Sequence, residues 1–246
     1  MSTILILGAG SDIARATAGV LASRGHDLIL AGRDTGLLER EATDLSLRYP
    51  VSVQTVFFDA LDTAGHTAFW DGLEPRPAGV VCAVGYLGEE SRAQAEPEEA
   101  QRVLASNFTG VVSILDEAAR RLAAAGSGFI VALSSVAGDR GRASNYHYGA
   151  AKAGLTAYLS GLRNRFATEG PRGVQVITVK PGFVATRMTA DLGLPPLLTA
   201  TPDEAARDIV NALERRRDVV YTRWFWRWIM ALITHLPELV FKRTRL

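Results

Sequence analysis

The chain has very little cysteine and almost no net charge. Its 246 residues include one cysteine, Cys82, and its 27 Lys and Arg residues are nearly balanced by 26 Asp and Glu residues, which leaves a net charge of +1. A single cysteine excludes an intrachain disulfide and fits a reducing compartment. Nucleic-acid-binding domains need a marked basic excess, so that class is excluded too. We therefore expect a cytoplasmic protein without a nucleic-acid partner.

Other absences argue against secretion and against metal chemistry. The N-terminus lacks a basic leader, and Ile4–Leu7 runs directly into a glycine turn, so we expect a first strand there rather than a signal peptide. No metal site is predicted, because ligand spacing is missing from the four histidines, His26, His66, His147 and His235. Repeats and low-complexity linkers are also missing, which favours one main domain.

What is present is an α/β pattern. Apolar residues make up 48% of the chain and charged residues 22%, as in soluble proteins with a large core. Short apolar runs alternate with helical patterns, which predicts a single Rossmann-type domain with a doubly wound, mostly parallel sheet of about seven strands and helices on both faces. The predicted strands are Ile4–Leu7, Asp27–Ala31, Val51–Phe57, Gly79–Gly85, Phe129–Leu133, Val174–Val179 and Asp218–Tyr221. The later helices are predicted over Thr35–Tyr49, Thr63–Leu73, Glu96–Ala105, Val111–Ala125, His147–Thr168 and Pro202–Arg215, the last with Thr201 as its N-cap.

A glycine turn follows the first predicted strand, and a helical pattern to about Arg24 follows the turn. Glycines let the backbone approach a pyrophosphate, and a helix N-terminus supplies N–H donors to it. Ala14 replaces the last glycine of the usual dinucleotide pattern, so a purely structural strand–helix turn is the alternative. The predicted cofactor residues of this turn are Gly8, Gly10, Ser11, Asp12 and Ile13.

The end of the second predicted strand indicates which dinucleotide binds. Arg33 follows Gly32 at the strand tip, where an arginine accommodates the 2′-phosphate of NADP and an acidic residue would bind the ribose of NAD. Asp34 comes one residue later and can instead cap the next helix. The sequence thus favours NADPH over NADH.

A tyrosine and a lysine share a helix face after the fifth predicted strand. Tyr148 and Lys152 are four residues apart, so they lie one turn apart on the same side. An ammonium group near a phenol favours the phenolate and is expected to lower the pKa of Tyr148, which makes it a usable acid or base. A hydroxyl from Ser134 or Ser135, at the strand end, can hold a carbonyl oxygen. Taken alone, this spacing is more often that of an ordinary Tyr and Lys on a helix face.

In this order, the motifs resemble those of the short-chain dehydrogenase/reductase family over about residues 3–222. The resemblance implies a catalytic tetrad of Asn107, Ser135, Tyr148 and Lys152, and the spacing of Ser135 to Tyr148 favours it over Ser134. It also implies further cofactor contacts, in part from the Pro181–Thr186 segment. These are Asp59, Ala60, Gly85, Tyr148, Lys152, Pro181, Val184 and Thr186.

Some positions depart from the family pattern. Asp12 and Ala14 replace glycines of the turn, and Cys82-Ala83-Val84-Gly85 stands where the family usually has Asn-Asn-Ala-Gly. A carboxylate at a helix start would repel a phosphate, so we expect the Asp12 side chain to face away from the pyrophosphate. The Ser-Asp-Ile-Ala form and the aromatic C-terminus are similar to a subgroup, the polyprenyl-phosphoryl-pentose 2-ulose reductases.

The resemblance implies an NADP-dependent oxidoreductase that acts on a carbonyl or the matching secondary alcohol. Tyr148 exchanges the proton, Lys152 tunes Tyr148, Ser135 orients the substrate oxygen, and Asn107 holds Lys152 through a water. NAD is the less favoured cofactor, and a dimer or tetramer is the family habit. Two alternatives stay open: a reductase of a lipid-linked keto-sugar, and a catalytically silent NADPH sensor. We expect residues 186–201 to form a mobile lid.

The tail, residues 223–246, follows the catalytic domain of residues 1–222. It holds three of the four tryptophans, and its uninterrupted apolar stretch, Trp228–Ile233, is too short to span a bilayer. The basic residues beside it suit a helix lying on an anionic membrane surface. They are Arg223, Arg227, Lys242, Arg243 and Arg245. The tail is expected either to pack on the domain or another subunit, or to contact the inner face of a membrane.

Overall fold

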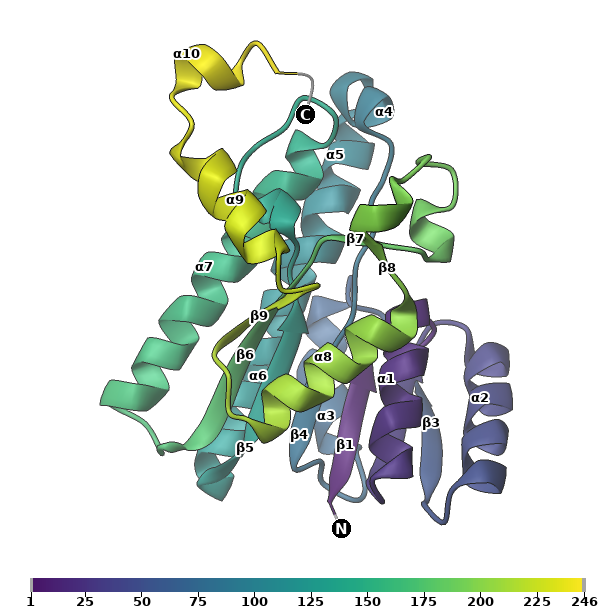
Figure 1. Ribbon diagram of the computed structural model, residues 1–246. Coiled ribbons are helices and arrows are strands. Elements are labelled where there is room, and N and C mark those ends of the chain that lie inside the picture. Colours follow the sequence, from purple (N-terminus) through teal and green to yellow (C-terminus); the bar gives the residue numbers. More distant parts are fainter. Residues whose placement is uncertain (1, 245–246) are drawn as a thin grey trace.

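Seven parallel strands form the central sheet of the protein (Figure 1). The computed structural model describes residues 2–244, so Arg245 of the tail lies outside the described residues. Every neighbouring pair in the sheet is parallel, as predicted. In spatial order the strands are β3 (Val53–Phe57), β2 (Asp27–Gly32), β1 (Thr3–Leu7), β4 (Gly79–Cys82), β5 (Ser127–Leu133), β6 (Gly173–Pro181) and β9 (Val219–Thr222).

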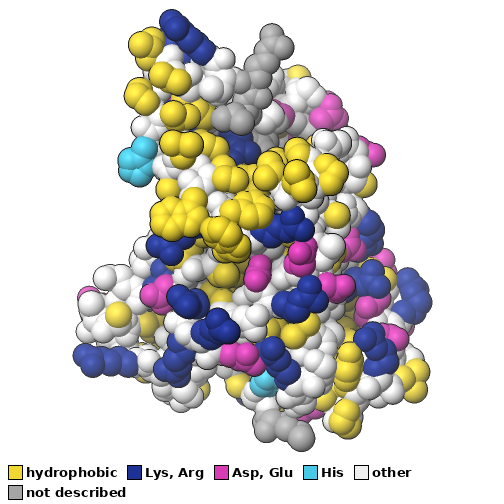
Figure 2. Space-filling view, viewed as in Figure 1, with side chains coloured by type: hydrophobic (Ala, Val, Ile, Leu, Met, Phe, Trp, Pro, Cys, Tyr) yellow, Lys and Arg dark blue, Asp and Glu magenta, His cyan; other side chains and the backbone are white. Residues whose placement is uncertain are grey.

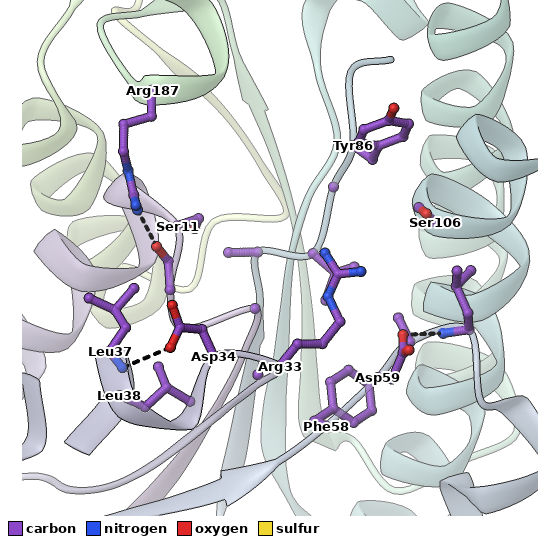
Figure 3. Close-up of a pocket in the computed structure, with 18 of the residues that line it drawn as sticks. Ser11, Arg33, Asp34, Leu37, Leu38, Phe58, Asp59, Tyr86, Ser106 and Arg187 are labelled. Atoms are coloured by element: carbon purple, nitrogen blue, oxygen red, sulfur yellow. Dashed lines mark hydrogen bonds between the residues drawn. The ribbon is translucent and has the colours of Figure 1, made fainter. Parts of the chain in front are cut away.

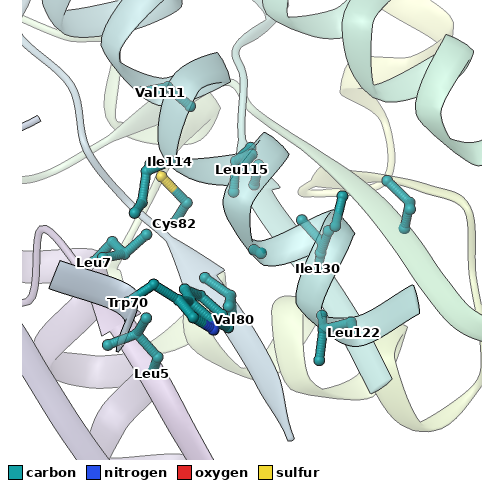
Figure 4. Close-up of a cluster of buried hydrophobic side chains, with 14 of the residues drawn as sticks. Leu5, Leu7, Trp70, Val80, Cys82, Val111, Ile114, Leu115, Leu122 and Ile130 are labelled. Carbon is teal, nitrogen blue, oxygen red and sulfur yellow. The ribbon is translucent and has the colours of Figure 1, made fainter. Parts of the chain in front are cut away.

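Alternate residues of each strand face opposite sides of the sheet, and each side has its own core. In β1, Leu5 and Leu7 belong to one cluster, whereas Ile4 and Ile6 belong to the other. Both sides are covered by helices, so parallel strands read as continuous apolar runs rather than as alternating ones. Figure 4 shows the first cluster, in which Trp70 and Ile114 pack onto the strands.

The helices divide between the two faces, which confirms the doubly wound prediction. One face carries α1 (Asp12–Ser23), α2 (Thr35–Arg48) and α8 (Pro202–Glu214). The opposite face carries α3 (His66–Asp71), α6 (Gly110–Ala125) and α7 (Tyr146–Thr168). Short polar side chains begin several of these helices, because they satisfy backbone N–H groups that have no partner within the helix. Ser11 caps α1, Asp34 caps α2, and Thr201 forms a capping box with Glu204 at α8.

The region after β4 differs from the prediction. We expected two helices with Asn107 and Gly110 between them, but α5 (Pro97–Leu104) continues through the π-turn η2 (Ala105–Thr109) into α6. A further helix, α4 (Glu90–Ala95), was not predicted, because its six residues are too few to show a period. The predicted lid contains the short turns η4 (Arg187–Thr189) and η5 (Pro196–Leu198), and a small second sheet pairs β7 (Phe183–Val184) with β8 (Thr199–Ala200).

The described part of the tail forms α9 (Trp226–His235) and α10 (Glu238–Phe241), which lie above β9 in Figure 1. Trp226 packs edge-on against Phe183, with 5.2 Å between ring centroids, and Met230 and Ile233 are buried in the same cluster. None of the helices within residues 2–244 is long and apolar enough to cross a bilayer.

A glycine at the start of α6 sets how closely this helix approaches the loop after β3. A Cβ at Gly110 would lie 2.2 Å from the carbonyl oxygen of Ala60, which is a backbone atom. We expect Gly110→Ala to lower the free energy of unfolding by about 1–3 kcal/mol, because overpacking displaces the loop. The matched control is Gly161→Ala in α7, where a Cβ meets nothing within 4 Å. It should raise stability by about 0.4–1 kcal/mol. Urea unfolding followed by circular dichroism measures both, and equal midpoints for Gly110→Ala and wild type would refute the contact.

Candidate active site

Two adjoining cavities open at the carboxyl ends of the strands. The strand order reverses between β1 and β4, and in open α/β sheets such a reversal leaves a crevice for ligands. The cavities have volumes of about 340 and 300 Å³. They share Ser11, Ala83, Val84, Gly85 and Arg187.

The glycine turn brings the end of β1 against the end of β4. Gly8 has a φ of +72°, and a Cβ there would lie 2.9 Å from the backbone nitrogen of Val84. Only glycine therefore fits both the backbone conformation and the space. Ser11 then begins α1, whose N-terminus points N–H groups into the crevice. Close backbone approach beside a helix N-terminus fits the pyrophosphate of a dinucleotide.

The Asp12 carboxylate is hydrogen-bonded to Arg187 of the predicted lid. Its Oδ2 accepts the backbone N–H of Arg187 at 2.7 Å, and its Oδ1 accepts Arg187 Nε at 2.9 Å. The guanidinium also donates to the carbonyl oxygen of Gly10, as Figure 3 shows. The Arg187 guanidinium thereby forms an ion pair with the Asp12 carboxylate and lies against the glycine turn.

An arginine extends into the first cavity from the tip of β2 (Figure 3). Arg33 is exposed, and residues 2–244 offer it no ion pair within 4.0 Å. Asp34 turns to its own helix and accepts the N–H of Leu37 at 2.9 Å. On the opposite wall, Asp59 accepts the N–H of Leu61, and Ala60 lies beside it. This end of the crevice therefore presents the positive charge of Arg33, while the Asp34 carboxylate caps α2.

Ser135, Tyr148 and Lys152 line the second cavity together. Lys152 comes from α7 and donates through Nζ to the carbonyl oxygen of Leu133 at 2.9 Å, with the Tyr148 ring centre 5.6 Å away. The Ser135 hydroxyl lies in the same cavity and accepts the backbone N–H of Ala137 at 3.1 Å. Ser134 points elsewhere, donating to the carbonyl oxygen of Lys152 and pairing with Thr156 Oγ1 at 2.7 Å. Ser134 thus ties α7 to the sheet, and Ser135 is the hydroxyl available in the cavity.

The expected pKa shift of Tyr148 is wrong for this structure. Burial raises the pKa of Tyr148 to about 12, and the nearby Ser135 hydroxyl only partly offsets the rise. Burial lowers the pKa of Lys152 to about 8. A low-dielectric site disfavours both charged forms, and this outweighs the attraction expected from helical spacing. Tyr148 therefore keeps its proton at neutral pH.

Asn107 lies behind the cavities rather than in their lining. It is fully buried in the π-turn, where its Nδ2 donates to the carbonyl oxygens of Tyr86 at 2.6 Å and Val103 at 2.8 Å. Its Oδ1 accepts the N–H of Tyr86. A Cβ at Gly85 would lie 3.3 Å from Asn107 Oδ1 and 3.6 Å from Lys152 Nζ, so both groups approach this glycine. Asn107 pins the chain that leaves β4.

The other predicted site residues all border the two cavities. Gly10 and Gly85 line the first, and Ile13 and the residues of the segment after β6 line the second. The members of that segment are Pro181, Val184 and Thr186. Among residues 2–244, no group of three or more His, Cys, Asp or Glu side chains could hold a metal ion.

Two contacts at the site were not predicted. Arg187 meets Asp12 from 175 positions along the chain, and no local pattern marks such a pair. Glu90 of α4 accepts His147 Nδ1 at 2.7 Å and the His147 backbone N–H at 3.3 Å, so it caps the start of α7 next to Tyr148. The sequence gives little indication of this cap. The start of α7 has no side-chain cap from its own segment, and Glu90 lies 57 positions away from His147.

Comparison with known proteins gives the same picture. Residues 2–195 match the family model of the short chain dehydrogenases. An uncharacterized oxidoreductase of Mycobacterium tuberculosis is 36% identical over 98% of this chain and 96% of its own.

Solved structures share the fold. A short-chain dehydrogenase from Sphingobium yanoikuyae in complex with NADPH has a TM-score of 0.82 and 25% identity, covering 97% of both chains. A short chain dehydrogenase/reductase from Burkholderia phymatum in complex with NAD has a TM-score of 0.83 and 22% identity. It covers 100% of this chain and 96% of its own.

The buried Lys152 makes stability depend on pH. The unfolded chain keeps this lysine protonated up to about pH 10.4, whereas the folded state releases the proton near pH 8. Between these values the unfolded state binds more protons, so stability rises with pH, and the penalty is fully present below about pH 8. We expect the stability gained by Lys152→Met to be larger at pH 7 than at pH 10 by about 2 kcal/mol.

Urea unfolding of wild type and variant at both pH values measures this difference. Lys242→Met, which replaces an exposed lysine at the end of α10, is the control and should give the same small change at both. A Lys152→Met effect that is independent of pH would show that the ammonium is not penalised by burial.

Proposed function

The chain belongs to the short-chain dehydrogenase family, and on that premise we propose that it reduces a carbonyl group with NADPH, or oxidises the matching secondary alcohol with NADP⁺. The observation that carries the proposal is the meeting of Tyr148, Ser135 and Lys152 at one cavity that adjoins the glycine turn. The general statement, an oxidoreductase of this family, does not depend on the proposal.

The dinucleotide would lie along the crevice. Gly8, Gly10 and the N-terminus of α1 would hold its pyrophosphate, and Arg33 would meet the 2′-phosphate at the tip of β2. Pro181, Val184 and Thr186 would border the nicotinamide beside Tyr148. When bound, the reduced nicotinamide supplies the hydride.

Tyr148 acts as the acid in the direction of reduction. It is neutral at pH 7 because burial raises its pKa to about 12, so its proton would be available to the carbonyl oxygen. Ser135 orients that oxygen through its hydroxyl. As the phenolate develops, the Lys152 ammonium, whose Nζ lies 5.6 Å from the ring centre, stabilises the negative charge. Tyr148 then regains a proton from solvent, which replaces the proton given to the carbonyl oxygen.

Asn107 and Glu90 support these groups from outside. Asn107 fixes the backbone at Tyr86, and Glu90 fixes the first turn of α7. Asn107 would also share a water with Lys152, since both approach Gly85. Apolar side chains, among them Ile13 and Val184, line the catalytic cavity and strengthen its electrostatics by limiting water.

Removal of the phenol oxygen tests the chemistry. Tyr148→Phe should lower kcat for carbonyl reduction by about 10²–10⁴-fold, since general acid catalysis contributes that much, while NADPH affinity stays within about threefold of wild type. Tyr146→Phe, an exposed tyrosine two residues earlier on α7, is the matched control and should keep full activity. NADPH oxidation with a panel of ketones and aldehydes gives kcat, and fluorescence titration gives the affinity.

The same assay separates an enzyme from a sensor. A wild-type protein that binds NADPH tightly but reduces no carbonyl in a broad panel would support the NADPH-sensor alternative. Full turnover by Tyr148→Phe would eliminate the assigned acid.

Replacement of the arginine at the strand tip tests cofactor choice. Arg33→Ala should weaken NADPH binding by about 10–100-fold through loss of a charge-assisted contact, with NADH binding unchanged. Arg48→Ala, at the far end of α2, removes an equal charge away from the cavity and should leave both affinities unchanged. Equal losses for NADPH and NADH with Arg33→Ala would contradict recognition of the 2′-phosphate.

A further inference from the structure

The helix α9 is apolar on two sides, and the rest of the chain covers only one. Trp226, Met230 and Ile233 face inward and are between 1% and 9% exposed. Trp228 and Leu232 face outward and are 64% and 69% exposed. A helix that is apolar all round belongs in an interior or in a membrane, so the outer side of α9 lacks a partner.

The outer side of α9 continues into a larger apolar face. Trp224 precedes the helix with 75% exposure, and Leu239 and Leu197 are 60% and 86% exposed. Arg223 joins the lid to the tail by donating through Nη1 to the carbonyl oxygen of Leu197 at 2.8 Å. Figure 2 shows hydrophobic side chains gathered over α9, α10 and the lid. The outer face is defined as Leu197, Trp224, Trp228, Leu232, Leu239 and Val240.

The surroundings of the outer face are basic. Arg227, Lys242 and Arg243 are exposed, and none of them has a carboxylate within 4.0 Å in residues 2–244. The run Arg215–Arg217 at the end of α8 is exposed as well. Two of the nearby acids are already paired, Glu204 with Arg223 and Glu238 with Arg140, and Asp208 and Asp218 are outnumbered by the surrounding arginines and Lys242. The rim therefore carries excess positive charge.

We propose that the outer face docks on the surface of an anionic lipid bilayer. Tryptophans favour the membrane–water interface, leucines enter the acyl boundary, and arginines attract anionic headgroups. A second copy of this chain fits less well, because a two-fold interface would place the same basic rim against itself. The rim charge thus selects an anionic partner.

Docking would place the catalytic cavity close to lipid. Trp226 lies so near the segment after β6 that a Cβ at Gly182 would be 2.0 Å from Trp226 Nε1, and Val136 packs in the same cluster directly after Ser135. The lid that carries Leu197 also carries Arg187 and Met188 of the cavity wall. If the function proposed above holds, a carbonyl compound that partitions into lipid is the class of substrate this arrangement suits.

Vesicle sedimentation with the full chain tests docking without relying on turnover. Wild type should sediment with vesicles that mix phosphatidylcholine and phosphatidylglycerol, and only weakly with vesicles of phosphatidylcholine alone. Raising the salt concentration should reduce sedimentation with the mixed, anionic vesicles. The double variant Trp228→Ser/Leu232→Ser should lose at least about tenfold in partitioning, because two apolar side chains no longer enter the interface. Leu47→Ser is the matched control: it removes a leucine that is 82% exposed on α2 and should bind as wild type does.

The charge arm uses Arg227→Gln/Lys242→Gln/Arg243→Gln, which should lower binding to the anionic vesicles only. Circular dichroism and urea unfolding verify that each variant is folded. The proposal is wrong if wild type binds neither vesicle, or if Trp228→Ser/Leu232→Ser binds as tightly as Leu47→Ser. It is also overturned if light scattering shows a dimer that only Trp228→Ser/Leu232→Ser disperses, since the outer face would then be a contact between copies. Vesicle binding without carbonyl turnover would leave docking standing and count against the proposed function alone.

Discussion

The ends of β1 and β4 meet at Gly8, and the rest of the site depends on that contact. The strand order turns in opposite directions on either side of this pair, so the connections leave a crevice above it. Gly8 can lie against the backbone of Val84 only because it has no side chain and tolerates a φ of +72°. This close approach sets α1 beside the end of β4, and it brings the Arg33 end and the Tyr148 end into one continuous cleft. A side chain at this position would collide with the backbone of Ala83 and Val84.

Within that cleft the fold bears an electrostatic cost. The fold buries Lys152 in surroundings that disfavour its charge, and a single hydrogen bond to Leu133 offsets only part of that cost. The same surroundings keep the proton on Tyr148, whose ring centre lies 5.6 Å from Lys152 Nζ. Ser134 explains how α7 stays in place despite this cost, because its hydroxyl bonds to the backbone of Lys152 and to Thr156 inside the core. Of the two neighbouring serines, Ser134 thus holds α7 in place, and Ser135 faces the cavity.

Most of the fold could be predicted from the sequence, because the patterns that mark strands and helix starts are local. Buried parallel strands appear as apolar runs, and Asp34 and Thr201 mark helix starts within four residues of the groups they cap. The candidate site could be assembled from ordered motifs, since each lies at a strand end and parallel strands end at one edge. What could not be read depends on contacts between distant segments. The pairing of Asp12 with Arg187 and of Glu90 with His147 has no local trace, and the π-turn at Asn107 looks like a break between helices. The direction of the Tyr148 pKa shift was wrong because helical spacing encodes the neighbour but not the burial that outweighs it.

The tail packs directly against the segment after β6 that borders the second cavity. Trp226 occupies the space that a side chain at Gly182 would need, so the segment that borders the cavity and the helix that carries the outer face share one contact. Phe183 on the same segment meets the Trp226 ring edge-on and begins β7, which pairs with β8 at the end of the lid. Gly182 thus resembles Gly8, since each lacks the side chain that would hold a neighbouring segment away.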